Sequence, residues 1–367
     1  VLFDDYYQLV EQHSGYTIAD PSGSGNKFGF SVKTNSSGSL LVIGARDADV
    51  GTATDAGTVY VYEKSSEKFI ANGTDNYVTL KGAVGSAYTV RLNGALQIDT
   101  VDYTVSIDGL TVTFTVTPDS GDIVTVDNNY FVRVQTLNGL ISAPNIQVGK
   151  EYTIFDIGSG DDETDFTLIG ARENTVGTMF VATGAGTGQG QVVAGYSISQ
   201  QQLGYDVDLG SNSCSIYASA VGYTKPDYNS GAVYRFVNQG KLYGEITGTK
   251  YAPTVTAGHS IKINGVEVTF TGTTLDQVVN DIELETIAGV TASNVGSRLH
   301  LSSNIVSTTN KLDISPGFTG TAIDDLGLEV FVPAQVILHP GVAQAEEFGS
   351  AIPVSYTHLT LPTILLV

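Results

Sequence analysis

The sequence has little sulfur and no long apolar run, and each shortage excludes a class of structure. Only one of the 367 residues is a cysteine, Cys214, so neither an intrachain disulfide nor a cysteine-based metal cluster can form. No run approaches the roughly 20 apolar residues that a membrane-spanning helix needs. We therefore expect no membrane insertion, and stability must come from packing and backbone pairing.

Positive charge is scarce as well. Lys and Arg together number 17 against 38 Asp and Glu, which gives a formal net charge of −21. Such a surface repels phosphate backbones, so nucleic acid is not expected as a direct partner. Dissolved salt would screen the self-repulsion, which suits a protein that works in salty surroundings.

Motifs that carry chemistry are also missing. The five histidines share no metal-ligand spacing, and there is no G-x-S-x-G elbow. The glycine-rich run 184–190 lacks the Lys-Ser/Thr ending of a phosphate loop. The sequence therefore favours a protein that is not an enzyme and holds no cofactor, although a carboxylate pair built from distant segments stays open.

Strand and turn residues are what the sequence does contain. It has 42 Gly, and Val, Thr, Tyr and Ile dominate its patterned stretches, which predicts a mainly β protein. The run Leu40–Ile43 is continuously apolar, which is typical of a strand buried on both faces. Residues 57–62, GTVYVY, then alternate like a half-buried strand.

The order of these elements occurs more than once. Residues 28–62 form a first copy and residues 203–236 a second, in which Leu-Gly at 203–204 stands where the first has Phe-Gly at 28–29. A third Phe-Gly pair, at 348–349, starts another copy. Each copy supplies three or four strands that cannot bury their faces alone, so we expect the copies to stack radially.

These motifs resemble FG-GAP repeats, which are the blades of integrin-α-type β-propellers. The matching parts are Phe-Gly at 28–29, Ile-Gly-Ala at 43–45 and the strand at 57–62, with Gly-Ala-Val-Tyr at 231–234 in the second copy. The resemblance implies a propeller scaffold. We therefore expect partial FG-GAP-type blades, interrupted by inserted β-sandwich-like and small α+β domains.

The resemblance does not extend to the acidic calcium loop of the family. The corresponding residues, 34–38 and 209–213, contain no carboxylate, whereas Ca²⁺ prefers several. Two acidic clusters elsewhere are weak calcium candidates, with ordinary solvated loops as the alternative for both. The first comprises Asp47, Asp49 and Asp55, and the weaker second comprises Asp161, Asp162 and Asp165.

The spacing of the copies predicts inserted domains. They start at residues 28, 203 and 348, much further apart than the roughly 40–60 residues of one blade. The expected order is propeller sequence over 1–74, an immunoglobulin-like β module over 75–145, a second β module over 146–195, propeller sequence over 196–247, a hairpin–helix–hairpin α+β module over 248–335, and the start of the third copy over 336–354.

Both ends of the sequence favour a fragment of a longer protein. The first residues, VLFDDYYQLVEQ, have no basic region and do not form a signal peptide. Residues 355–367 resemble translated sequencing-adapter DNA, as found at the ends of metagenomic assemblies, and we expect them to lie outside the fold. A genuine apolar edge strand is the alternative.

The whole arrangement resembles large tailed-phage virion proteins, prompted by residues 165–170 and 261–275. That resemblance implies a non-enzymatic structural and recognition protein on a virion or cell surface. Its partners would be other virion subunits and a host glycan or cell-surface protein. The alternatives are a calcium-dependent, integrin-like bacterial adhesin and a virion-associated glycan depolymerase with scattered carboxylates.

Overall fold

The computed structural model describes most of the chain between residues 25 and 338. The described residues are 2–3, 9–11, 18, 20–21, 25–80, 88–194, 197–210, 213–224, 230–307, 311–317 and 319–338. The expected third copy at 348–349 and the tail 355–367 lie outside them. The described chain is mainly β, which confirms the prediction from composition.

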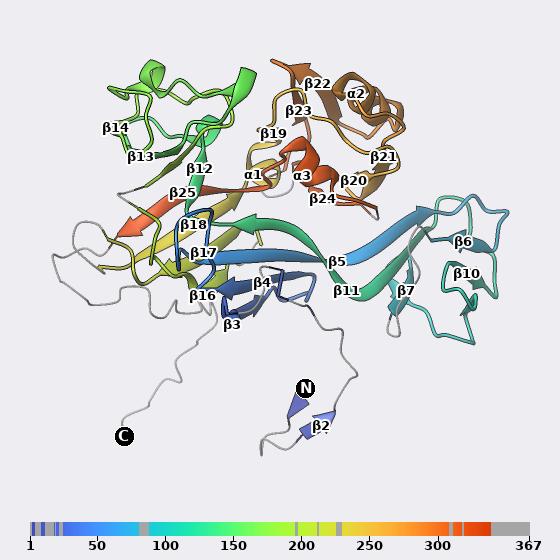
Figure 1. Cartoon of the computed structure of the whole chain (residues 1–367). Coiled ribbons are helices and arrows are strands. Elements are labelled where there is room, and N and C mark those ends of the chain that lie inside the picture. Colours follow the sequence, from blue (N-terminus) through green and yellow to red (C-terminus); the bar gives the residue numbers. More distant parts are fainter. Residues whose placement is uncertain are drawn as a thin grey trace, which may run out of the picture.

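Two four-stranded antiparallel meanders form the centre of the molecule (Figure 1). Meander A consists of β3 (Phe28–Thr34), β4 (Leu40–Ala45), β5 (Thr58–Ile70) and β11 (Ile123–Leu137). Meander B consists of β16 (Leu203–Leu209), β17 (Ser215–Ala220), β18 (Ala232–Asn238) and β25 (Phe331–Leu338). Each meander contains one copy of the sequence repeat, so the repeat in sequence is also a repeat in topology.

The meanders pack against each other through glycine. β16 lies against β3 and β4, and a Cβ on Gly44 would overlap the carbonyl oxygen of Gly204. Gly204 has a left-handed φ of 87°, and the equivalent Gly29 has 83°. No described atom lies within 4 Å of a Cβ added to Gly29, so the close approach occurs at Gly204 and not at Gly29. Gly44 and Gly204 thus allow the two backbones to meet.

The strand β4 is buried on both faces. All six of its residues are buried, which confirms the reading of the apolar run Leu40–Ile43. Val42 and Val61 face meander B and share its core, whereas Ile43 and Tyr60 belong to a smaller cluster on the opposite face.

Both meanders are interrupted at the same place, between their third and fourth strands. In meander A the interruption is the ribbon module, residues 71–122, carried at the far end of the β5–β11 ribbon. Its strands are β6 (Tyr77–Thr79), β7 (Tyr88–Leu92), β8 (Ala95–Leu96), β9 (Tyr103–Val105) and β10 (Thr111–Phe114). The sheet β6-β10-β9 and the extended ribbon sheet share a core that contains Val90, Tyr103, Val112 and Val124.

In meander B the interruption is the helical module, residues 239–330. It contains α1 (Gln239–Tyr243), β19 (Glu245–Thr247), β20 (Ser260–Ile263), β21 (Val266–Thr269), α2 (Leu275–Leu284), β22 (Val290–Val295), β23 (Arg298–Ser303), β24 (Ile314–Pro316) and α3 (Ala322–Leu326). Thr274 and Gln277 form a capping box at the start of α2, and Val278 and Ile282 on its apolar stripe are buried.

The middle module, residues 138–194, joins the two meanders. It contains β12 (Leu140–Ser142), β13 (Glu151–Asp156), β14 (Met179–Val181), β15 (Gln191–Val193) and three 3₁₀ turns (Ala143–Asn145, Gly160–Asp162, Phe166–Ile169). The strand β12 pairs with β15, and Phe131–Leu137 pairs with β5 in meander A. The structure thus differs from the expected boundary at 145, because strand residues run on past Leu137 with only Asn138 and Gly139 between.

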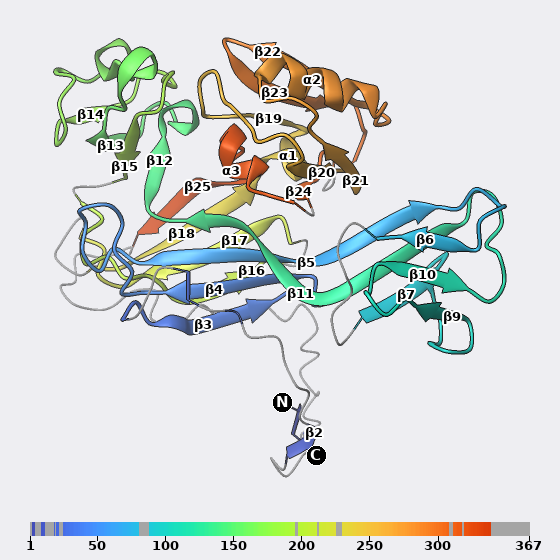
Figure 2. The same cartoon turned by 45° about the vertical axis from the view of Figure 1, so that its right-hand side comes forward.

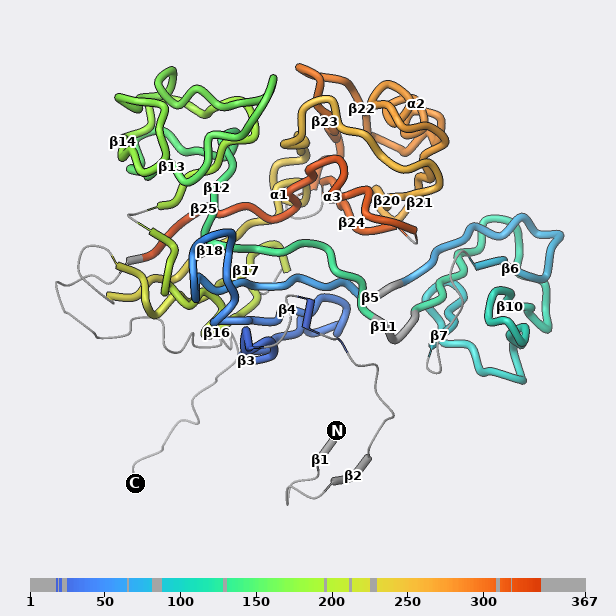
Figure 3. Tube along the Cα trace, viewed as in Figure 1, coloured from blue at the N-terminus to red at the C-terminus, as the bar shows by residue number. Residues whose placement is uncertain are grey.

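The three modules occupy two sides of the central meanders. The middle and helical modules lie next to each other above β11 and β25, whereas the ribbon module extends away from the rest (Figures 1 and 2). The backbone trace shows the same separation (Figure 3). Within the described residues, no helix is long and apolar enough to cross a membrane.

Candidate functional site

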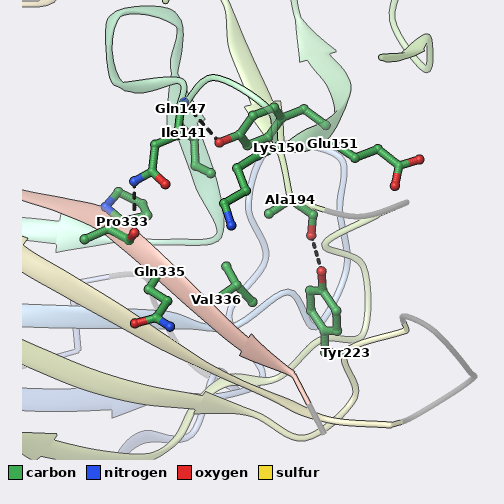
Figure 4. Close-up of a pocket in the computed structure, with 11 residues that line it drawn as sticks. Ile141, Gln147, Lys150, Glu151, Ala194, Tyr223, Pro333, Gln335 and Val336 are labelled. Carbon is green, nitrogen blue, oxygen red and sulfur yellow. Dashed lines mark hydrogen bonds between the residues drawn. The ribbon is translucent and has the colours of Figure 1, made fainter. Parts of the chain in front are cut away.

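The best-formed cavity lies between the middle module and β25 (Figure 4). Its volume is about 410 Å³. The residues that line it come from three segments: Ile141, Gln147, Lys150, Glu151, Tyr152 and Ala194 of the middle module, Tyr223 after β17, and Pro333, Ala334, Gln335 and Val336 of β25. We refer to it as the β25 pocket.

The floor of the β25 pocket is a protected edge strand. Among the described residues, β25 pairs with β18 alone, and a bulge between Arg235 and Phe236 leaves Ala334 out of register. The Gln147 side chain donates from Nε2 to the carbonyl oxygen of Ala334 at 2.9 Å. Pro333 has no N–H to leave unpaired. The backbone of this edge is therefore partly occupied by a side chain rather than by another strand.

A second glutamine protects the other end of β25. Gln135 of β11 donates from Nε2 to the carbonyl oxygen of Phe331 at 2.8 Å and accepts from its N–H at 2.7 Å. Its amide reproduces the paired bonds of a neighbouring strand. Meander A thereby fixes the strand that floors the pocket in meander B.

Two buried tyrosines form the walls. Tyr152 is 3 % exposed and Tyr223 is 2 % exposed. The Tyr152 hydroxyl accepts from the Gln147 N–H at 3.1 Å, and the Tyr223 hydroxyl donates to the carbonyl oxygen of Ala194. Burial raises the pKa of both phenols, and the charge of Glu151 raises that of Tyr223 further. Both rings are therefore neutral walls whose hydroxyls are already engaged.

Lys150 and Gln335 are the groups left to meet a ligand. Both are exposed, and in the described part of the chain neither side chain makes a hydrogen bond or ion pair. Lys150 points toward Val336 and Gln335, whereas Glu151 points away (Figure 4). The pocket therefore presents one ammonium and one amide over an apolar floor. It can bind a polar ligand, and Glu151 is the one carboxylate among the described residues that line it.

The first predicted acidic cluster follows one loop. Asp47 lies 3.3 Å from Nε of Arg46, and Asp49 accepts from the backbone N–H of Asp55 at 2.9 Å. The Arg46 guanidinium also stacks on the ring of Phe30, 4.2 Å from its centroid. Asp47 is therefore paired with Arg46, and Asp49 with the backbone of Asp55.

The second predicted cluster divides between two roles. Asp162 pairs with Arg298 of the helical module, and their side chains are 9 % and 13 % exposed. Asp165 caps the turn Phe166–Ile169 by accepting from the N–H of Thr167 at 2.9 Å, and Asp161 is exposed. Among the described residues, no group of three or more His, Cys, Asp or Glu is placed to hold a metal. Calcium at either cluster stays a prediction.

Sequence reasoning did not find the β25 pocket. Gln147, Lys150 and Gln335 belong to no motif, and they meet only because β25 returns to meander B after the helical module. A scan against protein-family models finds no match to the chain, and a comparison with curated proteins finds none either.

Proposed function

We propose that the chain is part of an FG-GAP-type β-propeller and serves as a non-enzymatic structural and recognition protein of a tailed-phage virion or a comparable surface assembly. One observation carries this proposal. Two meanders of the same strand order pack face to face, and each is interrupted by a module between its third and fourth strands.

The position of the interruptions favours display. The third-to-fourth connections carry the modules without interrupting the first three strands of either meander. A module inserted there leaves the contact of β16 with β3 and β4 intact. Loops and inserts placed by a rigid core are where binding functions concentrate.

The β25 pocket is the recognition site that this proposal favours. It lies at the junction of the middle module and meander B, has an apolar floor and offers Lys150 and Gln335 as polar groups. Such a mixture suits a segment of a host glycan or of a cell-surface protein.

Two measurements test the proposal. The purified chain is applied to a glycan array and to host cells, and purified virions from the source material are analysed for its peptides by mass spectrometry. We expect binding to a restricted set of glycans or to the cells, and peptides in the virion fraction. A chain that binds neither and is absent from virions contradicts the proposal. Shortening of host polysaccharide during incubation would favour the depolymerase instead.

A further inference from the structure

One ion pair of the helical module meets at a buried carboxylate oxygen. Nζ of Lys241, in α1, lies 2.9 Å from Oδ1 of Asp313, just before β24. The two side chains are 19 % and 31 % exposed, but Oδ1 itself is buried. Within the part of the chain that the structure describes, this oxygen accepts no hydrogen bond of regular geometry. The ammonium is therefore its close partner, and a buried charge held in this way is costly.

The backbone fixes the two residues side by side. The N–H of Leu312 donates to the carbonyl oxygen of Gly240 at 3.1 Å, and a Cβ on Gly240 would lie 2.4 Å from the carbonyl oxygen of Leu312. Asp313 is also held from its other side. Its N–H donates to Oδ1 of Asn264 at 2.8 Å, and its carbonyl oxygen accepts from the Asn264 N–H at 2.8 Å. The side chains of Lys241 and Asp313 therefore start from fixed positions.

A third group, Glu63 of β5, faces this pair. It interacts with Lys241 and Asp313, and with the hydroxyl of Ser315. Asp313 and Ser315 are two residues apart along β24 and its entry, so their side chains lie on the same face. Glu63 is itself fixed within meander A, where it pairs with residues of β4 and β11. Its carboxyl thus stands opposite the ion pair.

The other groups beside the pair are already engaged. Lys262 donates from its ammonium to the carbonyl oxygen of Ser66. The buried thiol of Cys214 borders the pair, and burial raises its pKa, so it stays neutral. Lys241 is therefore the amine, and Asp313 the carboxyl group, that this arrangement brings together.

We propose that Lys241 and Asp313 condense to an amide that cross-links α1 to the entry of β24, with Glu63 as the proton carrier. The new bond joins Nζ to Cγ. One C–O bond of the Asp313 carboxyl group breaks, and that oxygen leaves as water with two of the three ammonium protons. The third proton stays on the amide nitrogen. Atoms and charge therefore balance, and no further reactant is needed.

Glu63 removes the obstacle to this reaction, which is charge. Desolvation lowers the pKa of Lys241, but the charges of Asp313 and Glu63 outweigh it and raise that pKa above 10.5. Burial, followed by the charge of Asp313, raises the pKa of Glu63 from 4.5 to about 7, so its carboxyl can take and give a proton near neutral pH. It carries one proton from the ammonium to Asp313, which leaves a neutral amine beside a neutral carboxylic acid.

Proximity favours the bond as well. Reacting groups held roughly 3–3.5 Å apart reach effective concentrations of about 10⁵–10⁸ M. Nζ lies 2.9 Å from an oxygen that is bonded to the reacting carbon. The amide is neutral, so its formation also relieves the cost of the buried charge.

Mass spectrometry of the intact, purified chain tests the cross-link. We expect a mass lower than that of the sequence by one water molecule. After digestion with trypsin, which does not cut at an acylated lysine, tandem spectra should identify one branched peptide that joins Lys241 to Asp313. Lys241→Arg keeps the positive charge but cannot form the amide, so it should have its full mass, and so should Glu63→Gln. Glu245→Gln, an exposed glutamate of the same module, should cross-link as the parent does.

Three results would overturn the proposal. A parent chain of full mass excludes the cross-link. A loss of water that persists in Lys241→Arg belongs elsewhere, as a succinimide at Asp108-Gly109 would give. A Glu63→Gln chain that is cross-linked as fully as the parent excludes Glu63 as the proton carrier. The branched peptide is sought in the parent chain, so the test of the cross-link does not depend on whether a variant folds.

Discussion

The ribbon and helical modules enter their meanders at the same point of the topology, yet they are attached in opposite ways. Core residues of the helical module, such as Ile261 and Phe270, belong to one cluster with Val61 of meander A and Tyr234 of meander B. The ribbon module keeps its own core and is joined through the two strands β5 and β11. The point of insertion therefore does not decide whether a module is rigid. Shared buried surface does.

Polar contacts strengthen the attachment of the helical module. Glu329, near its end, accepts from Ser142 Oγ at 2.5 Å and from Asn145 Nδ2 at 2.7 Å, both in the middle module. Arg298 pairs with Asp162 of the same module. These contacts hold the helical and middle modules together. Among the described residues, the ribbon module has no such contact with the middle module.

The largest effect should come from emptying one core at a time. Phe270→Ala in the helical module and Phe114→Ala in the ribbon module each remove a buried ring, at a cost of about 3–5 kcal/mol. Because only the first core is shared, Phe270→Ala should lower the main melting transition, whereas Phe114→Ala should lower a separate one. Differential scanning calorimetry distinguishes the two. A single transition moved equally by both variants would show that the modules unfold together.

Loosening the contact between the meanders should lower the main melting transition and leave that of the ribbon module unchanged. Gly44→Ala forces a methyl group into the backbone of Gly204 and should destabilise the main transition by about 3 kcal/mol. The transition of the ribbon module should not move. Gly184→Ala is the matched control, because its nearest described neighbour lies at 3.6 Å, an ordinary contact. Equal melting of the two variants would mean that the glycine contact is dispensable.

Local sequence patterns encode several elements of both modules. The turns at Asn93-Gly94 and Asn264-Gly265 have the positive φ angles that tight hairpins need, and α2 has its capping box. These features depend on neighbours in sequence. The meander repeat could also be found, because its strand and glycine motifs recur in the same order along the sequence.

Contacts between distant segments could not be predicted in the same way. Asp162 looks like part of an acidic loop, and its partner Arg298 is 136 residues away. The β25 pocket likewise needs Gln147 of the middle module to meet Gln335 of meander B. No local pattern encodes such a pairing, because it depends on how whole modules dock. This also explains why the sequence alone did not show that the helical module is firmly attached and the ribbon module is not.

A smaller effect should follow from the tie at Glu329. Burial is the largest cause that raises the pKa of its carboxyl above 4.5, while the bonds from Ser142 and Asn145 oppose it. The stability it gives is therefore complete below about pH 4.5 and is lost as the pH rises above that value. Glu329→Gln should flatten this pH dependence and, by losing one acceptor, cost about 1 kcal/mol. Thermal melts of the main transition from acid to neutral pH measure both. Unchanged pH dependence in the variant would exclude Glu329 as its source.

The smallest effect on stability and the most specific effect on binding should come from Lys150. Its side chain is exposed, so Lys150→Ala should change stability by no more than about 0.5 kcal/mol. Loss of a charge-assisted contact should weaken ligand binding about tenfold. Lys68→Ala, an exposed lysine on the ribbon, is the control, and titration calorimetry with any glycan found on the array gives the affinities. If Lys68→Ala weakened binding and Lys150→Ala did not, recognition would belong to the loosely held module. The meanders would then serve as the scaffold that presents the ribbon module to its ligand.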